Sequence, residues 1–177
     1  MRRWGSLVAA VVGLASPTAA SAGGLIDEAR LGLLDHDIGL FDHHSEHGID
    51  VNGELLFASP GFLAAIGAPH PNLGLTANTS GNTDYGYFGL AWSGMLWGPI
   101  FGELGLGGAV HDGELNPTPD HRKALGSRIL FHEDLELGYR LTNEFGLSAF
   151  LDHISNANLA HHNQGLTNLG MRGAFFF

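Results

Sequence analysis

Two stretches in the second half of the chain alternate, with a period of two, between large apolar residues and small or polar ones. In residues 100–111 one face carries Ile100, Leu104, Leu106 and Val110, and the other carries Glu103, Gly105, Gly107 and Ala109. Residues 128–140 repeat the pattern, and Glu133 alone interrupts their apolar face. Successive side chains of a strand point to opposite faces. Apolar residues on one face and small or polar residues on the other are typical of a barrel strand that faces lipid.

Similar stretches, separated by turn-forming residues, predict eight strands. They cover residues 29–41, 51–58, 73–79, 85–97, 100–111, 128–140, 144–155 and 166–177. Long loops around 42–50, 112–126 and 156–164 alternate with short turns around 97–99 and 141–143, and only the link at 59–71 is longer than this scheme expects. The pattern predicts an all-β fold: an eight-stranded antiparallel transmembrane β-barrel of the outer-membrane type.

Such a barrel is expected to close by pairing its first strand, near Leu31, with its last, near Phe175. Eight strands enclose a space that side chains fill, so the interior should be packed and should not form a pore. Charged residues that face inward are expected to pair there: Arg128, Arg140, Arg172, Glu103, Asp134 and Glu136.

The first 22 residues have the pattern of a secretory signal peptide. A basic start, Met1-Arg2-Arg3, precedes an apolar run from Leu7 to Leu14 and the small residues Ala20-Ser21-Ala22. Cleavage there would leave residues 23–177 as one barrel domain and, by removing two arginines, would change the net charge from −10 to −12. This acidity argues against nucleic acid as a partner. The chain has no cysteine, so no disulfide supports the fold.

Histidines cluster in the first long loop, Asp42-His43-His44-Ser45-Glu46-His47-Gly48. A loop of this composition can bind zinc, but these residues lack a rigid scaffold, so a solvated loop is the favoured interpretation. We therefore predict neither a metal nor a cofactor.

The candidate chemistry lies where the seventh predicted strand ends. His153 and Ser155 share a face with Leu147 and Leu151, whereas Asp152 points to the other side. A histidine two residues from a serine on one strand face is spaced so that the imidazole can accept the hydroxyl proton, which is the arrangement of a nucleophile and its base. A polar rim at the end of a packed strand is the alternative interpretation.

The segment His153-Ile154-Ser155-Asn156-Ala157, on the seventh strand of such a barrel, resembles the PagL lipid A 3-O-deacylases. The broader acyloxyacyl hydrolase family is similar in Leu33-Leu34-Asp35-His36-Asp37-Ile38, Leu56-Phe57-Ala58-Ser59-Pro60 and Val110-His111-Asp112-Gly113. The resemblance implies an integral outer-membrane serine esterase that removes the 3-O acyl chain of lipid A (the lipid part of lipopolysaccharide). By the same resemblance Ser155 would be the nucleophile, His153 the general base and Asn156 a support of the oxyanion hole.

The chain departs from the family at the acid of the triad. The resemblance aligns that acid with Thr167, in Asn163-Gln164-Gly165-Leu166-Thr167, and a threonine supplies no charge. Glu133 is a candidate substitute, because it is expected on the same outer face, opposite Leu151 and diagonal to His153. It is equally well explained as a carboxylate near the lipid headgroups. Asp152 is expected to face inward and is a poorer candidate.

Two functions remain open at the level of sequence. The paired His153 and Ser155 favour an esterase, whereas Thr167 favours a non-catalytic small barrel that binds lipopolysaccharide or a surface partner through its acidic loops. The sequence leaves open the preferred acyl chain and whether the protein is a monomer or a dimer.

Overall fold

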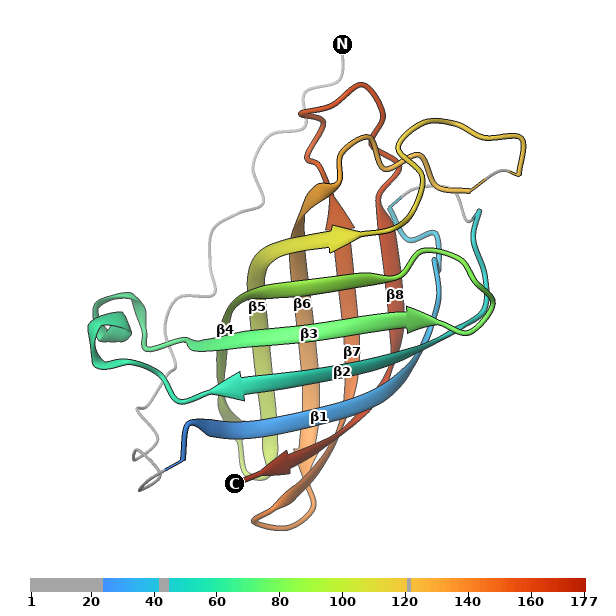
Figure 1. The fold of residues 1–177 in the computed structure, drawn as a ribbon. Coiled ribbons are helices and arrows are strands. Elements are labelled where there is room, and N and C mark those ends of the chain that lie inside the picture. Colours follow the sequence, from blue (N-terminus) through green and yellow to red (C-terminus); the bar gives the residue numbers. More distant parts are fainter. Residues whose placement is uncertain (1–23, 42–44, 121) are drawn as a thin grey trace.

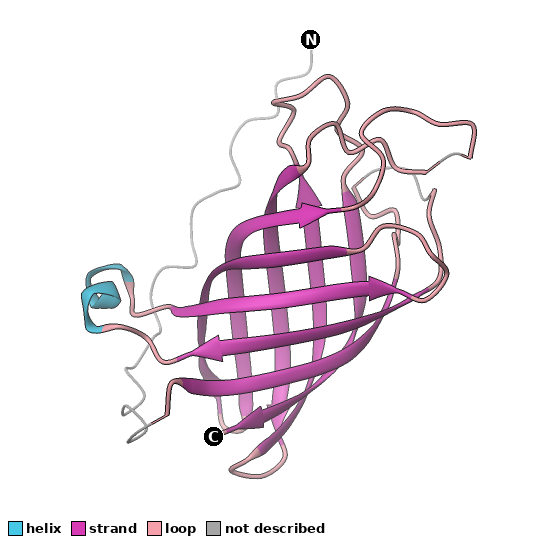
Figure 2. Cartoon of the chain, viewed as in Figure 1, coloured by secondary structure: helices cyan, strands magenta, loops and turns pink. Residues whose placement is uncertain are grey.

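The computed structural model describes residues 24–41, 45–120 and 122–177. They form a closed barrel whose eight antiparallel strands follow one another in chain order (Figures 1 and 2). The strands are β1 (Ile26–Asp35), β2 (Ile49–Phe57), β3 (His70–Asn78), β4 (Tyr85–Trp97), β5 (Ile100–His111), β6 (Ile129–Arg140), β7 (Phe145–Ser155) and β8 (Leu166–Phe176). The predicted fold is therefore confirmed. The predicted signal peptide, residues 1–22, lies outside the described residues.

The first strand is shorter than predicted. β1 ends at Asp35, whereas the sequence pattern extended it to Phe41. The chain leaves the sheet because Asp37 and Gly39 have positive φ angles of 53° and 66°, which a strand does not adopt. Apart from that end, the predicted strand limits agree with the structure to within three residues.

The barrel closes between β1 and β8. Ala29 lies opposite Phe175 and Leu31 lies opposite Gly173, which confirms the predicted pairing of the two terminal strands. Gly32 lies where these strands approach closely, since a Cβ there would come within 2.5 Å of both the Arg172 side chain and the Met171 carbonyl oxygen. This position therefore has no room for a side chain.

Two arginines occupy the centre of the barrel interior. Arg30 Nη1 contacts Glu103 at 2.5 Å and Glu136 at 2.6 Å, and Arg172 Nη1 contacts Glu54 at 2.6 Å. All five side chains are buried. Because a charge removed from water is costly unless it is paired, this network is what allows a charged interior to fold.

The inward charges differ in part from the expected set. Arg172, Glu103 and Glu136 pair as predicted, and Arg30 is a central member that the sequence pattern did not identify. Arg128 instead donates to the Gly113 carbonyl at 2.6 Å, and Arg140 lies over the Phe176 ring at 3.9 Å. These two residues lie where strands begin or end, and there the side chains reach loops and rim residues and not the central network.

The outer surface of the wall is apolar over all eight strands. Large side chains that a soluble protein would bury are exposed: Leu31, Leu33, Val51, Leu73, Leu75, Phe88, Leu104, Leu106, Leu135, Leu137, Leu147, Leu169 and Met171. Apolar residues outside and charges inside are the arrangement of a barrel that spans a lipid bilayer. Among the residues that the structure describes, none belong to a helix long and apolar enough to cross a membrane.

The two ends of the barrel differ in their connections. Residues 36–48, 79–84, 112–128 and 156–165 connect strands at one end, which we call the loop end. At the other, the turn end, lie residues 58–69, 98–99 and 141–144, the start of β1 and the end of β8. The link 58–69 contains a short 3-10 helix, η1 (Gly61–Ile66). It explains why this connection is longer than the other two on its side.

Candidate active site

His153 and Ser155 are the last outward-facing residues of β7, at the loop end of the barrel. Both side chains are half-buried, and they continue the outer face formed by Leu147 and Leu151. Asp152, as expected, is buried on the inner side, where it accepts a hydrogen bond from the Tyr85 hydroxyl at 2.5 Å. The structure thus places a polar pair on the wall that otherwise faces lipid.

Thr167 is the partner of the His153 imidazole. The two residues lie directly opposite each other on β7 and β8, and His153 Nδ1 lies 2.7 Å from Thr167 Oγ1. When Nδ1 carries the proton it donates to Thr167, and the lone pair of Nε2 is then available to act as a base. The sequence indicated Thr167 as the position of the acid but gave no sign that its hydroxyl bonds the histidine.

Two further residues confine the imidazole ring. Gly165 has no side chain, and a Cβ there would lie 2.5 Å from His153 Cε1 and 2.9 Å from Nε2. On another side the Phe41 ring meets the imidazole edge to face, with centroids 5.3 Å apart. Neither contact was expected, because Phe41 was assigned to a strand and Gly165 was noted only as part of the segment aligned with the acid of the triad.

Ser155 lies opposite Phe131 and shares the face of His153. Within the part of the chain that the structure describes, its hydroxyl makes no hydrogen bond, including none to His153. The strand spacing therefore brings the two side chains to one surface, but a hydrogen bond between them would have to form when substrate binds. Catalytic hydrogen bonds are often long or absent before substrate is bound.

Glu133 lies on the other side of His153. The sequence placed it opposite Leu151, but the structure pairs Glu133 directly with His153, and Leu135 with Leu151. That prediction was wrong by two residues, because the turn between β6 and β7 sets a register that the apolar alternation alone does not define. No hydrogen bond or ion pair joins Glu133 to His153, both of which are described residues. The imidazole thus lies between a carboxylate and a hydroxyl and bonds the hydroxyl.

Asn156 is buried, and its hydrogen bonds connect two loops. Its side-chain amide donates to the carbonyl oxygens of Leu125, at 2.8 Å, and His162, at 2.6 Å, and its backbone N–H donates to Asn163 Oδ1 at 2.8 Å. The two residues that follow, Ala157 and Asn158, have positive φ angles of 52° and 63°. The chain therefore turns sharply after Asn156. The bond to Leu125 joins loop 112–128 to loop 156–165, and the bonds to His162 and Asn163 fix the conformation of loop 156–165 itself.

A buried ionic cluster joins three loops at the same end. His36 lies between Asp50, at 2.8 Å from Nδ1, and Glu46, at 3.0 Å from Nε2. Glu46 also accepts from the backbone N–H groups of Thr83, at 3.0 Å, and Lys123, at 2.8 Å. We call these residues the loop cluster. It was missed from the sequence because it brings together residues far apart in the chain.

The loop cluster is ionised at neutral pH. Burial disfavours the charged imidazole, but the hydrogen bonds to Asp50 and Glu46 outweigh it and raise the pKa of His36 from 6.5 to about 9. Burial also acts against the Glu46 carboxylate, yet hydrogen bonds from His36, Thr83 and Lys123 lower the pKa of Glu46 to about 2. The Ile38 N–H, two residues after His36, donates to the Thr167 carbonyl oxygen at 2.8 Å. The cluster is thereby connected to the strand that supports His153.

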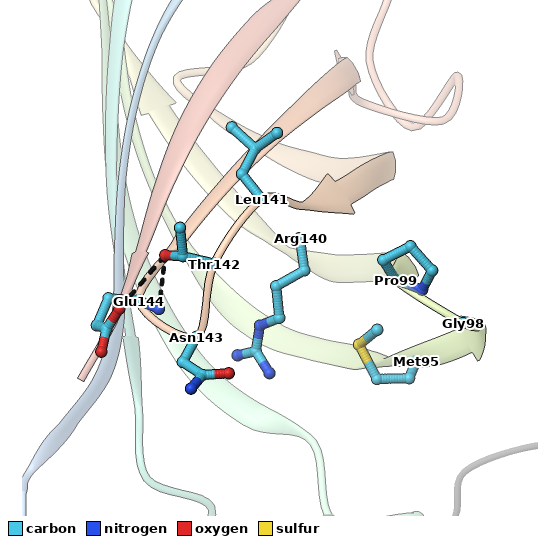
Figure 3. A pocket seen from close by; sticks show the side chains of 8 residues that line it. All are labelled: Met95, Gly98, Pro99, Arg140, Leu141, Thr142, Asn143 and Glu144. Carbon is cyan, nitrogen blue, oxygen red and sulfur yellow. Dashed lines mark hydrogen bonds between the residues drawn. The ribbon is translucent and has the colours of Figure 1, made fainter.

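Two other features do not add to this site. Of the histidine-rich loop, Asp42, His43 and His44 lie outside the described residues. Among residues 24–41, 45–120 and 122–177, no group of three histidines, carboxylates or cysteines is arranged to hold a metal. A surface hollow bounded by Met95, Arg140 and Glu144 belongs to the turn end, far from β7's last residues (Figure 3).

Known protein families and curated protein sequences give different results for this chain. The model of one protein family, lipid A 3-O-deacylase (PagL), matches residues 68–175. A comparison with curated protein sequences gave no significant match.

Three solved structures share the fold at low sequence identity. The crystal structure of the outer membrane enzyme PagL has 18% identity and a TM-score of 0.61, covering 86% of this chain and 99% of that one. A de novo designed transmembrane β-barrel has 11% identity and a TM-score of 0.56, covering 88% and 98%. The N-terminal β-barrel domain of Pseudomonas aeruginosa OprF has 12% identity and a TM-score of 0.53, covering 85% and 98%. At such identities the likeness concerns the fold alone.

Proposed function

The chain belongs to the lipid A 3-O-deacylase (PagL) family, and we propose that it is an outer-membrane esterase that removes the ester-linked 3-O acyl chain of lipid A. The observation that carries the proposal is the family match over residues 68–175, which includes His153, Ser155 and Thr167. The position of these residues on the outer wall supports it. A lipid substrate cannot enter a filled barrel, but it can reach the outer wall sideways from the membrane.

In the proposed reaction Ser155 is the nucleophile and His153 the base. Ser155 Oγ attacks the ester carbonyl carbon while its proton passes to His153 Nε2, and an oxyanion forms on the carbonyl oxygen. Collapse of this intermediate breaks the bond to the sugar oxygen, which takes the proton from Nε2. Water then hydrolyses the acyl-enzyme, with His153 again as base, and releases a fatty acid. The contact between Nδ1 and Thr167 Oγ1 supports Nε2 as the nitrogen that acts.

The third position of the triad has two candidates. Thr167 orients the imidazole through its hydroxyl, and we infer that it is the positioning residue; it offers no negative charge to the imidazolium that forms during catalysis. Glu133 carries a carboxylate but makes no hydrogen bond to the His153 ring, although the two residues are paired across β6 and β7. Substitutions at the two positions separate these roles and are described in the Discussion.

For Asn156 the structure favours an indirect role. Its donors bond Leu125, His162 and Asn163 and are not directed at a substrate. We therefore propose that Asn156 supports the oxyanion hole by fixing the sharp turn after β7, and that it does not itself bond the oxyanion.

A non-catalytic barrel that binds lipopolysaccharide is the second candidate, favoured by the missing hydrogen bond between Ser155 and His153. Incubation of the purified protein with lipid A, followed by mass spectrometry, separates the two. We expect the parent protein to release one acyl chain from the 3-position and Ser155→Ala to release none, since the nucleophile is removed. Ser80→Ala, at an exposed loop serine, is the matched control. Intact lipid A with the folded parent protein, or equal release by Ser155→Ala, would rule out the proposed esterase.

A further inference from the structure

The link between β2 and β3 differs in composition from the long loops of the barrel. Residues 58–69 contain no charged residue and no histidine, whereas loops 36–48 and 112–128 each contain several charged residues and at least one histidine. Of the residues of η1, none is buried. The side chain of Phe62 is 80% exposed and that of Ile66 is 53% exposed. We call residues 58–69 the apolar link.

The apolar link lies against the outer wall of the barrel. Trp92 of β4 pairs with Leu104 of β5, whose side chain belongs to the exposed apolar surface, so Trp92 shares that outward face. Its indole N–H donates to the carbonyl oxygen of Ile66 at 2.8 Å. At Gly67, where φ is 94°, a Cβ would lie 3.3 Å from the Trp92 ring. The end of η1 is thus fixed to a residue of the lipid-facing surface.

The backbone of the link satisfies part of its own hydrogen bonding. Leu63 N–H donates to the Pro60 carbonyl at 2.9 Å, and Ala68 N–H donates to the Leu63 carbonyl at 3.0 Å. Ala58 N–H donates to the carbonyl of Leu25, just before β1, at 3.0 Å. Internal pairing of this kind is what a segment needs in order to leave water for a lipid environment.

Aromatic side chains lie at the turn end of β4, β6, β7 and β8. Outward or rim positions at the turn end carry Trp92, Trp97, Tyr139, Phe145, Phe175 and Phe177. Rings of aromatic residues mark the interfaces of membrane barrels. In Figures 1 and 2 η1 lies to one side of the strands, beyond the ends of β2 and β3. Because the end of η1 contacts Trp92 of the outer wall, the exposed face of η1 adjoins the surface that meets lipid.

We propose that the apolar link is a membrane-interface segment, in which η1 places Phe62 and Ile66 among the acyl chains of the leaflet at the turn end. The occupant of its exposed face is lipid, because the face is uncharged, continuous with the lipid-facing wall and held there by Trp92. The proposal does not depend on the deacylase activity, since His153 and Ser155 lie at the opposite end of the barrel.

The absence of cysteine makes a site-specific test direct. A single Phe62→Cys variant, spin-labelled and reconstituted in phosphatidylcholine vesicles, is compared by electron paramagnetic resonance for collisions with oxygen and with a water-soluble nickel chelate. Leu73→Cys, outward on β3, is the lipid-facing reference, and Asn143→Cys, in the exposed turn 141–144, is the aqueous reference. Ile66→Cys serves if Phe62→Cys does not fold. Heat-modifiable gel migration shows which variants form the barrel.

We expect the label on the link to favour oxygen over the nickel chelate, as at position 73. Nickel accessibility equal to that at position 143 would overturn the proposal. Spin–spin broadening at position 62 that disappears on dilution with unlabelled protein would also overturn it, because the face would then be covered by a second copy of the chain. Lipid A deacylation, measured on the same samples, tests the proposed function separately.

Discussion

His36 and His153 lie at the same end of the barrel but in opposite surroundings. His36 is buried between two carboxylates, and its side-chain hydrogen bonds join the start of loop 36–48 to Glu46 near the end of that loop and to Asp50 of β2. His153 is half-buried on the outer wall, and among the described residues its ring hydrogen-bonds a neutral hydroxyl alone, with Gly165 leaving open the space beside its Nε2 edge. A histidine that is hydrogen-bonded to two carboxylates is held in its protonated state. One that has a neutral partner can gain and lose a proton during a reaction. The comparison separates a structural histidine from a candidate catalytic one.

Replacing each histidine by asparagine should give opposite results. We expect His153→Asn to lower the deacylation rate by at least about 10³-fold, because the base is lost, and to change thermal stability little. His36→Asn should leave the rate nearly unchanged when the protein is folded, but should destabilise it by about 3–5 kcal/mol because two buried carboxylates lose their partner. Mass spectrometry of lipid A gives the rate, and heat-modifiable gel migration gives the stability. Similar rates for both variants would refute the assignment of His153 as base.

A smaller loss of deacylation rate is expected when a methyl group is introduced beside the His153 ring. Gly165→Ala places a Cβ 2.5 Å from His153 Cε1, and the imidazole has to move off Thr167 to make room. A displacement of about 1 Å at a catalytic group costs roughly 10²-fold in rate. Gly53→Ala is the matched control, since the nearest atoms to a Cβ there are 4.0 Å away on the same outer wall. Equal rates for the two variants would show that the ring position observed here does not matter for catalysis.

How much of the fold and of the candidate site could be predicted from the sequence depends on how far apart in the chain the interacting residues are. The strands and the outward positions of His153 and Ser155 follow from a period of two, which is a local property. Glu133 was placed two residues from its true partner because apolar alternation is the same after a shift of two. The contact between Thr167 and His153 depends on the pairing of β7 with β8, which alternation does not define.

The loops were the least predictable part. Leu40 and Phe41 extended the apolar pattern past Asp35, so a strand was expected where the chain in fact leaves the sheet. The ion pairs of His36 with Glu46 and Asp50 join residues whose spacing in the chain carries no period. In the interior, alternation places Arg30 on the face opposite Leu31 and Leu33, but its pairing with Glu103 and Glu136 on distant strands was not identified. Charge that is buried by distant parts of the chain leaves no local signal.

The two candidates for the third position should differ in their effect on the rate. Thr167→Val removes one neutral hydrogen bond to His153, so we expect a fall of about 3–10-fold in kcat with little change in KM. Thr167→Ser, which retains a hydroxyl, is the matched control. We expect Glu133→Gln to leave the rate unchanged and Thr167→Glu to raise it by supplying a charge. A fall of roughly 10²–10⁴-fold in Glu133→Gln would instead identify Glu133 as the acid.

The smallest effect on the rate is expected from titrating the loop cluster, which should change stability alone. Because the pKa of His36 is raised from 6.5 to about 9 in the folded protein, its contribution is complete below pH 6.5 and is lost as the pH rises through 9. The raised pKa corresponds to a contribution on the order of 3 kcal/mol. The pKa of Glu46 is lowered to about 2, so its contribution is complete above about pH 4.5 and is lost only in stronger acid. The unfolding temperature should therefore fall between pH 6.5 and 9 in the parent protein and fall less in His36→Asn. An equal fall in both proteins would mean that other groups govern this range and that His36 is not held charged by Glu46 and Asp50.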